Sequence, residues 1–364
     1  TLQKTGKIRS LRFFCLFLPR DYIYLVIIKR QHIVEHYTAD RNKTWDDFVA
    51  ASRNATFLLR RGYMDYHSDR FTDRSLMIYR SDGDRRRLIA LFAACDGNEG
   101  EICAHAGLTY GGLVMSDASD GAEILEVIRG IISFYRCAGY RIMRYKAVPH
   151  IYHSRPAEED IYALFRCGAR LSECNLSSTI DLRSPIAFNE NSRRNMRRAL
   201  RSGVTIAESR DFEVYWQVLE NLLDSRYGTK PVHSAAEIAM LASRFPRNIR
   251  LFVALNTTGT VIAGTVIYVT EACVHAQYIA ASPEGKSLGA LPLLFDTVIG
   301  RHCGHARYFD FGTSNEDHGR YLNEGLIMQK NGMGGRGVTY NTYVIDLSHP
   351  APDGQSQATT SQDN

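Results

Sequence analysis

Residues 275–302, HAQYIAASPEGKSLGALPLLFDTVIGRH, read as an apolar strand, a loop with two glycines and a helix. Because Gly285 and Gly289 carry no side chain, the loop lets backbone N–H groups approach a phosphate, and Lys286 adds positive charge. The N-terminus of the following helix also favours an anion. A simple turn is the alternative, since glycine often serves that purpose alone. The predicted phosphate-binding residues are Gly285, Lys286, Ser287, Gly289 and Ala290.

Strands and helices alternate on both sides of this stretch. A strand, RYFDFGTSN, follows at 307–315, and the alternation extends back toward the N-terminus. We therefore expect an α/β (α+β) protein of two similar units, residues 25–184 and 185–347, each a mixed twisted sheet flanked by helices. Residues 1–24 are expected to form an extension outside the fold, and the Ser/Gln-rich stretch 348–364 a disordered tail.

The composition is that of a soluble folded protein. Apolar residues make up 45% of the 364 residues and charged residues 23%, which excludes a collagen, a coiled coil and a chain disordered throughout. The formal net charge of +5 gives no indication of DNA binding. Eight cysteines form no CxxC pair, so we expect no metal site, and reduced thiols favour a cytoplasmic location. The apolar run 13–18 is too short for a transmembrane segment.

Several phrases between residues 34 and 347 resemble one family of bacterial enzymes. They are RRGYMDYHSDRF (60–71), HAGLTYGGLV (105–114), KPVHS (230–234), HAQYIAASPEGKSLGALPLLF (275–295) and YFDFGTSNEDHGRYLNEGLIMQKNGMGGRG (308–337). With these phrases the chain resembles the tandem-GNAT, Fem-type acyltransferases. The resemblance implies two GNAT-like domains, with the acyl donor in the second and the acceptor in a cleft between them. Family members use acyl-CoA or aminoacyl-tRNA, so acyl-CoA is the expected co-substrate and tRNA the alternative.

The resemblance also implies where the chemistry occurs. In the GNAT fold one strand is splayed, and a backbone N–H on it stabilises the oxyanion; the matching residues here are Tyr278, Ile279 and Ala280. Attack by an amine also needs a base, and the candidates are His275, His233, Asp310 and Glu316. Two alternatives stay open: Glu316 as a cap of the next helix, and His275 as a core histidine.

The proton donor for the leaving thiolate departs from the ordinary GNAT pattern. Many GNAT enzymes place a tyrosine four residues before a Gly-aromatic pair, and the matching position here is Met328. Tyr321 lies two helical turns earlier on the same face and is the candidate substitute. This departure fits the Fem-type group better than ordinary acetyl-CoA enzymes.

Two stretches of the first half are candidate acceptor sites. The stretch 63–71 concentrates charge and aromatic rings that suit a polar acceptor, namely Tyr66, His67, Asp69 and Arg70. In the second, Gly111 allows close backbone approach and Tyr110 is expected to face the cleft. His233 and Asn315 complete the predicted acceptor set. A solvated loop and simple turn chemistry are the alternatives.

A predicted helix over 191–203 has a strongly cationic face, formed by Arg193, Arg194, Arg197, Arg198 and Arg201. Such charge runs usually form a solvated surface, although this one could bind a donor phosphate, tRNA or a lipid-linked diphosphate.

Together with this resemblance, the sequence predicts an N-acyltransferase of the Fem-type group in the GNAT (N-acetyltransferase) superfamily. It would move an acyl group from acyl-CoA to a small-molecule or peptide amine by direct attack in a ternary complex. The alternatives are an aminoacyl-tRNA-dependent transferase acting on cell-wall peptide, and a catalytically silent protein that binds the acyl donor.

Overall fold

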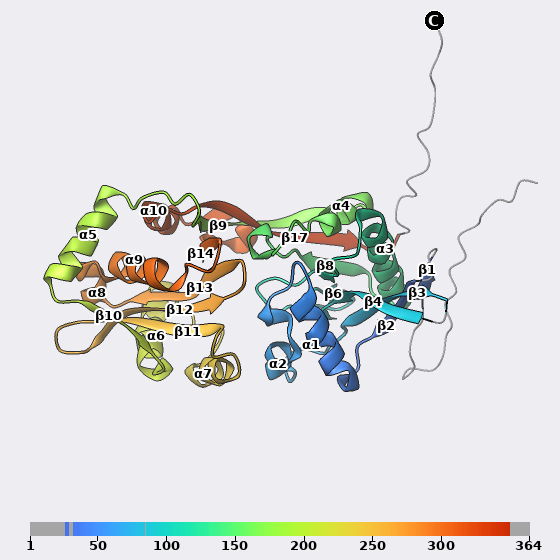
Figure 1. Cartoon of the computed structure of the whole chain (residues 1–364), viewed down its shortest axis with the longest axis horizontal. Coiled ribbons are helices and arrows are strands. Elements are labelled where there is room, and N and C mark those ends of the chain that lie inside the picture. The colour runs from blue at the N-terminus through green and yellow to red at the C-terminus, as the bar shows by residue number, and fades with distance from the viewer. Residues whose placement is uncertain (1–25, 29–31, 84, 350–364) are drawn as a thin grey trace, which may run out of the picture. The chain divides into compact units, whose positions relative to one another are not determined.

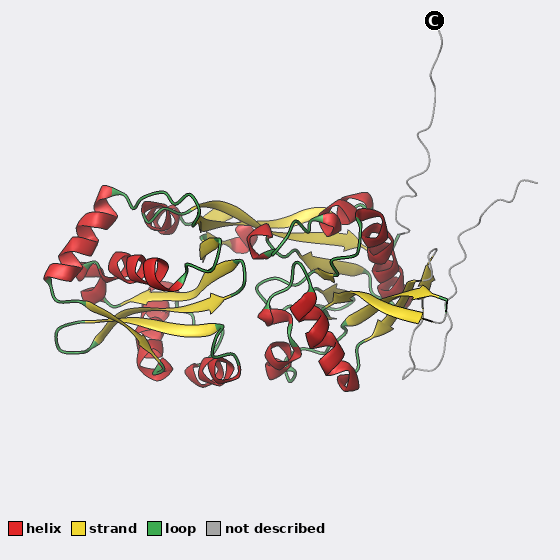
Figure 2. Ribbon diagram, in the orientation of Figure 1, coloured by secondary structure: helices red, strands yellow, loops and turns green. Residues whose placement is uncertain are grey.

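The computed structural model describes residues 26–28, 32–83 and 85–349. The predicted extension, 1–24, and residues 350–364 of the predicted tail lie outside these residues. Helices and strands alternate through the described chain, which confirms the α/β class (Figure 1). Figure 2 shows the helices flanking mixed sheets, as expected.

Contacts between residues divide the chain into two compact units. The first unit contains the described residues up to Val148, together with 155–172 and 342–349; the second contains 149–154 and 173–341. The second unit is therefore inserted within the sequence of the first. The predicted boundary at 184/185 differs from this division, because the strands near both junctions, β9 (Arg170–Asp181) and β17 (Arg336–Asp346), have residues in both units.

The first unit contains an antiparallel sheet of order β1-β2-β3-β4-β7 and the strands β17-β8-β6-β5. Its remaining strands are β1 (Val26–Ile28), β2 (His32–His36), β3 (Leu76–Asp82), β4 (Arg85–Phe92), β5 (Cys95–Asp96), β6 (Glu101–Cys103), β7 (Leu113–Met115) and β8 (Ile142–Lys146). Its helices are α1 (Asn42–Ala51), α2 (Arg61–Met64), α3 (Gly121–Cys137) and α4 (Glu159–Arg166).

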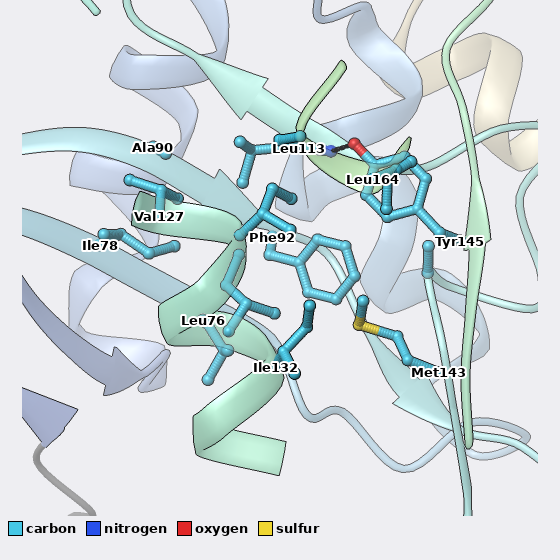
Figure 3. Close-up of a cluster of buried hydrophobic side chains, with 14 of the residues drawn as sticks. Leu76, Ile78, Ala90, Phe92, Leu113, Val127, Ile132, Met143, Tyr145 and Leu164 are labelled. Carbon is cyan, nitrogen blue, oxygen red and sulfur yellow. Dashed lines mark hydrogen bonds between the residues drawn. The ribbon is translucent and has the colours of Figure 1, made fainter. Parts of the chain in front are cut away.

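The core of the first unit forms where α3 and α4 bury apolar side chains against these strands. In α3 the buried residues Ile124, Val127 and Ile131 recur at helical spacing, and Asp120 caps the first turn by accepting from the N–H of Glu123. Figure 3 shows Phe92 of β4 inside this cluster, with its ring stacked on that of Tyr145 at a centroid distance of 5.8 Å.

The second unit contains the strand order β10-β11-β12-β13-β14-β9. Its remaining strands are β10 (Thr205–Ser209), β11 (Ile249–Leu255), β12 (Val261–Val269), β13 (Cys273–Ala281), β14 (Tyr308–Thr313), and the hairpin β15 (Asn315–Glu316) and β16 (Tyr321–Leu322). Its helices are α5 (Glu190–Arg201), α6 (Phe212–Tyr227), α7 (Ala235–Arg244), α8 (Pro283–Leu288), α9 (Ala290–His302) and α10 (Glu324–Gly332), and a short 3-10 turn, η4 (His150–Tyr152), precedes them.

Strand β13 parts from β14 after its first residues. The two strands pair in parallel only from Cys273↔Tyr308 to His275↔Asp310, whereas β13 continues alongside β12 as far as Ala281. The predicted splayed strand is thus confirmed. Beyond His275, the side of β13 that faces β14 has no partner strand within the described chain.

The predicted glycine loop before α9 is wrong. Residues 283–288 form the short helix α8, because Ser282 caps it by accepting from the N–H of Gly285 and Pro283 is preorganised for the first helical position. Gly289, with φ of 79°, then ends α8 and begins α9 in the left-handed region that glycine enters without strain.

Candidate functional site

The point where β13 and β14 separate brings two predicted catalytic residues together. His275 of β13 and Asp310 of β14 are the last pair in register, and His275 Nδ1 lies 2.7 Å from Asp310 Oδ2. Gly312, with φ of 78°, leaves room for the ring, since a Cβ there would lie 3.3 Å from His275 Cε1. The sequence had offered His275 and Asp310 as alternative bases, whereas the structure joins them in one pair.

Asp310 is fully buried and accepts four hydrogen bonds. Ser177 and Thr179 of β9 donate to Oδ1 over 2.5 and 2.7 Å, and Tyr340 of β17 donates to Oδ2 over 2.7 Å, beside His275. Burial alone would raise the pKa of Asp310, but the hydrogen bonds, led by that from His275, hold it below its usual value. The carboxylate is therefore ionised at neutral pH.

An ionised Asp310 fixes the tautomer of His275. Because the carboxylate can only accept, Nδ1 carries the proton and Nε2 presents its lone pair. No described residue bonds Nε2, and the side chain keeps 10% of its surface exposed. A histidine held in this way can accept a proton from a substrate at Nε2.

Lys330 is a candidate that the sequence reasoning missed. It is 5% exposed, and its Nζ donates to the carbonyl oxygens of Gly312 and Thr313, at the end of β14, over 2.9 and 2.7 Å. Burial lowers the pKa of Lys330 to about 8, although Asp310 opposes the shift. The sequence carried one signal, a lysine inside the stretch 328–333, but nothing in that stretch indicated its burial.

Tyr152 and Tyr340 were also missed. Tyr152 of η4 is 3% exposed, and its hydroxyl lies 2.6 Å from that of Tyr340, which is 7% exposed. Their positions in the sequence, 188 residues apart, gave no indication of this contact.

Glu316 and Tyr321, the other two catalytic candidates, lie in the β15–β16 hairpin and pair with each other across it. Glu316 is exposed and accepts from Asn323 Nδ2 over 3.1 Å, while Tyr321 is 58% exposed. Asn315, predicted to bind the acceptor, instead fastens the hairpin by accepting from the N–H of Leu176 over 2.5 Å. Within the described residues, none of the three bonds the His275–Asp310 pair.

Tyr278 and His233 form a separate buried cluster against α6. Tyr278 OH lies 2.5 Å from His233 Nδ1, and Trp216 Nε1 donates to the carbonyl oxygen of His233 over 2.9 Å. The side chain of Tyr278, on the predicted oxyanion strand, therefore holds His233. Ala280 is buried, Ile279 is half-buried, and the pairing with β12 shifts between Val266 and Ile267, opposite Gln277.

The predicted phosphate-binding residues fall on α8 and the start of α9. Lys286 and Ser287 are exposed, whereas Gly285, Gly289 and Ala290 are buried. A Cβ on Gly285 would lie 2.1 Å from the carbonyl oxygen of Ile262. Close packing on β12 is therefore a sufficient reason for glycine at this position.

The acceptor candidates of the first unit lie partly in the interior and partly on the surface. His67 is 2% exposed and lies between Tyr66 and His105, with ring centroids 4.2 and 5.1 Å away. Asp69 and Arg70 are exposed and lie 3.9 Å apart.

The predicted exposure of Tyr110 toward a cleft is wrong. The residue is 2% exposed, and its hydroxyl lies 3.0 Å from Thr56 Oγ1. The predicted close backbone approach at Gly111 does occur, but toward the chain itself: a Cβ there would lie 2.7 Å from the carbonyl oxygen of Ala104.

The arginine face of α5 is exposed, as predicted from its spacing. Glu190 lies within ion-pair distance of Arg193 and Arg197, at 2.9 and 2.5 Å. In the described residues we find no group of three or more His, Cys, Asp or Glu side chains that could hold a metal ion. No helix of the same part of the chain is long and apolar enough to cross a membrane.

Comparison with known proteins identifies the fold. Residues 187–320 match the family model of the acetyltransferase (GNAT) domain. The crystal structure of FemX superposes with a TM-score of 0.61 at 12% identity, covering 86% of this chain and 97% of FemX. L-PGS from Bacillus licheniformis superposes with a TM-score of 0.54 at 14% identity, covering 84% of this chain and 91% of that chain. No curated protein matches the sequence. The chain therefore carries a GNAT acetyltransferase domain and shares, along most of its length, the fold of FemX, as predicted for a tandem-GNAT, Fem-type protein.

Proposed function

We propose that this protein is an N-acyltransferase that moves an acyl group from the thioester of an acyl-CoA to an amine, by direct attack in a ternary complex. The observation that carries the proposal is the pair of His275 Nδ1 and Asp310 Oδ2, 2.7 Å apart where β13 and β14 separate. The match of residues 187–320 to the GNAT acetyltransferase domain supports the reaction class.

In this mechanism His275 is the general base. The amine nitrogen attacks the thioester carbonyl carbon, and Nε2 accepts a proton from that nitrogen as the new C–N bond forms. Asp310 stabilises the resulting imidazolium through Nδ1–H. The C–S bond then breaks, and the thiolate of coenzyme A leaves and takes up a proton.

Negative charge develops on the carbonyl oxygen and then on sulfur. Backbone N–H groups of β13, over Tyr278, Ile279 and Ala280, are the proposed donors to the oxyanion. Lys330 Nζ donates hydrogen bonds to the carbonyl oxygens of Gly312 and Thr313, and these bonds hold the cation near the end of β14. We assign it the electrostatic stabilisation of the leaving thiolate.

The donor class is tested by thermal unfolding of the protein with acetyl-CoA, longer acyl-CoAs and free CoA. A ligand present at 100 times its Kd stabilises the folded state by about 2.7 kcal/mol, which is a clear increase in Tm. An amine panel assayed by release of free thiol then tests turnover. Stabilisation without turnover of any amine would favour the silent donor-binding alternative.

The base is tested by comparing two variants in that assay. If His275 is the base, His275→Gln lowers kcat/KM by about 10²–10⁴-fold, and Glu316→Gln changes it by less than about tenfold. His302→Gln on α9 is the matched control for loss of a histidine. A loss of tenfold or more in Glu316→Gln with an active His275→Gln would assign the base to Glu316 instead.

A second candidate, an aminoacyl-tRNA donor, is favoured by α5. The helix carries five exposed arginines and a single acid, Glu190, which pairs with Arg193 and Arg197. The remaining positive charge is suited to binding phosphates. If no CoA compound stabilises the protein, binding of aminoacyl-tRNA is measured at several salt concentrations. Arg194→Gln with Arg201→Gln should then weaken binding and flatten its salt dependence.

A further inference from the structure

Two buried tyrosines, which the proposed mechanism does not use, form a chain of hydrogen bonds that leads to the carboxylate of Asp310. Tyr340 OH donates to Asp310 Oδ2, the same oxygen that holds His275 Nδ1. Tyr152 OH lies 2.6 Å from Tyr340 OH. A phenol has one proton, and Tyr340 gives its proton to Asp310, so Tyr152 is the donor to Tyr340. The hydrogen bonds therefore run in one direction, from Tyr152 to Tyr340 to Asp310.

The surroundings make this chain of hydrogen bonds effective. Tyr152 and Tyr340 are 3% and 7% exposed and Asp310 is fully buried, so water screens none of the three groups strongly. In such an environment each hydrogen bond polarises the next one. Tyr152 also packs its ring edge-on against His275, with centroids 6.4 Å apart.

We propose that Tyr340 and Tyr152 are positioning residues that limit the basicity of His275 by withdrawing negative charge from Asp310. A carboxylate whose Oδ2 also accepts from Tyr340, itself polarised by Tyr152, stabilises the imidazolium less than one whose Oδ2 bonds His275 alone. The consequence for catalysis rests on the proposed function. The proposed effect of the tyrosines on His275 itself does not depend on that function, because it can be measured in the protein without substrate.

The other groups that face this pair come from five elements. Cys273 lies on β13, Lys330 on α10, and Ser177 and Thr179 on β9, beside Tyr152 on η4 and Tyr340 on β17. Burial raises the pKa values of Cys273 and Tyr340 well above their usual ranges, and that of Lys330 is about 8. Between pH 5 and 7, histidine is the residue type of this set that ordinarily titrates.

The test is NMR titration of the whole protein labelled with ¹³C at histidine Cε1, with His275→Gln to assign the signal. In Tyr340→Phe we expect the midpoint of the His275 titration to move to higher pH by at least about 0.5 unit. In Tyr152→Phe we expect a smaller movement in the same direction, since this change only weakens the Tyr340 donor.

Tyr145→Phe is the matched control. Tyr145 donates to the buried carboxylate of Asp160 over 2.5 Å in the first unit, so its loss removes an equivalent hydrogen bond elsewhere. The His275 midpoint should not move in this variant, even if the protein is less stable.

Unchanged or lower midpoints in both tyrosine variants would overturn the inference. If Tyr340→Phe does not fold, Tyr152→Phe decides, and Thr179→Val tests the same withdrawal of charge at Oδ1, where it should also raise the midpoint. Raised midpoints in a protein that turns over no acyl donor would keep the inference and refute the proposed function. Full turnover with unmoved midpoints would refute the inference and keep the proposed function.

Discussion

Lys330 is a buried cation whose charged form is disfavoured by its site. Burial lowers its pKa from 10.5 to about 8, so below pH 8 both the folded and the unfolded chain carry the proton. Between pH 8 and 10.5 the unfolded chain binds a proton that the folded chain lacks. The free energy of unfolding therefore rises with pH in this window on account of Lys330.

The contribution of Lys330 to this pH dependence can be measured by comparing the wild type with Lys330→Met. The stability of the wild type minus that of Lys330→Met should increase by about 2 kcal/mol from pH 7 to pH 10. Urea unfolding at both pH values measures it, and the difference cancels groups that titrate in both proteins. Lys286→Met, on the exposed side of α8, is the matched control. A difference that stays constant or falls would contradict the assigned burial of Lys330.

His105 in the first unit gives a pH dependence of the same sign in a more acidic window, because its pKa is lowered as well. The residue is 5% exposed and its Nδ1 is buried without a hydrogen-bond partner in the described structure. Burial, with His67 nearby, lowers its pKa to about 3. From pH 6.5 downward the unfolded chain gains a proton that the folded chain does not, so stability falls as the pH falls.

We expect His105→Asn to remove this acid sensitivity. From pH 7 to pH 4 the wild type should lose about 3 kcal/mol more of its unfolding free energy than the variant. Asparagine tolerates the positive φ of 30° at this position. His318→Asn is the matched control, since His318 also has a positive φ, 53°, but is 73% exposed. Equal acid sensitivity in wild type and His105→Asn would refute the prediction.

At the residue scale, the sequence predicted the chemical groups better than their partners. His275 and Asp310 were both candidates because a base was required, but their contact joins two strands 35 residues apart and depends on the sheet order. No local pattern indicated that Tyr152 or Lys330 would be buried, since burial of a polar side chain is decided by tertiary packing.

The segment β13–α8–α9 shows how packing fixes an element that the sequence predicted only in part. The strand and the second helix follow from their apolar patterns. Helix α8 was missed because Gly285 and Gly289, four residues apart, indicate a loop, whereas Gly285 is required by its close contact with β12.

This explanation of Gly285 gives a prediction for the element. In Gly285→Ala the new Cβ would lie 2.1 Å from the carbonyl oxygen of Ile262, so α8 must move away from β12. We expect a loss of about 1–3 kcal/mol in unfolding free energy. The control is Gly300→Ala in α9, where no atom lies within 4 Å of the new Cβ and the helix should gain up to about 1 kcal/mol.

Chemical denaturation of both variants checks the prediction, and CoA binding adds a second readout. Gly285→Ala could instead keep its stability but no longer bind a CoA compound that stabilises the wild type. That result would support the predicted role of Gly285 in phosphate binding.

The chain as a whole is not two consecutive units. The end of β17 belongs to the first unit, where it pairs with β8 from Thr342↔Lys146 to Asp346↔Ile142. Ile345 and Leu347, 3% and 1% exposed, lie in the core cluster of that unit with residues of α3 and α4. Sequence alternation could not indicate this, because a strand pattern does not specify which neighbour the strand pairs with.

A fragment of residues 25–184 should therefore fail to fold. Without residues 342–347, β8 presents an open edge on one side, and the core loses two fully buried aliphatic side chains, each worth about 1.5–3 kcal/mol. Adding residues 336–349 after a flexible linker should restore cooperative unfolding. The same addition with Ile345→Asp and Leu347→Asp is the matched control, and it should remain unfolded because it buries charge in the core. Circular dichroism and urea unfolding of the three proteins decide. Cooperative unfolding of fragment 25–184 alone would show that the first unit does not need β17.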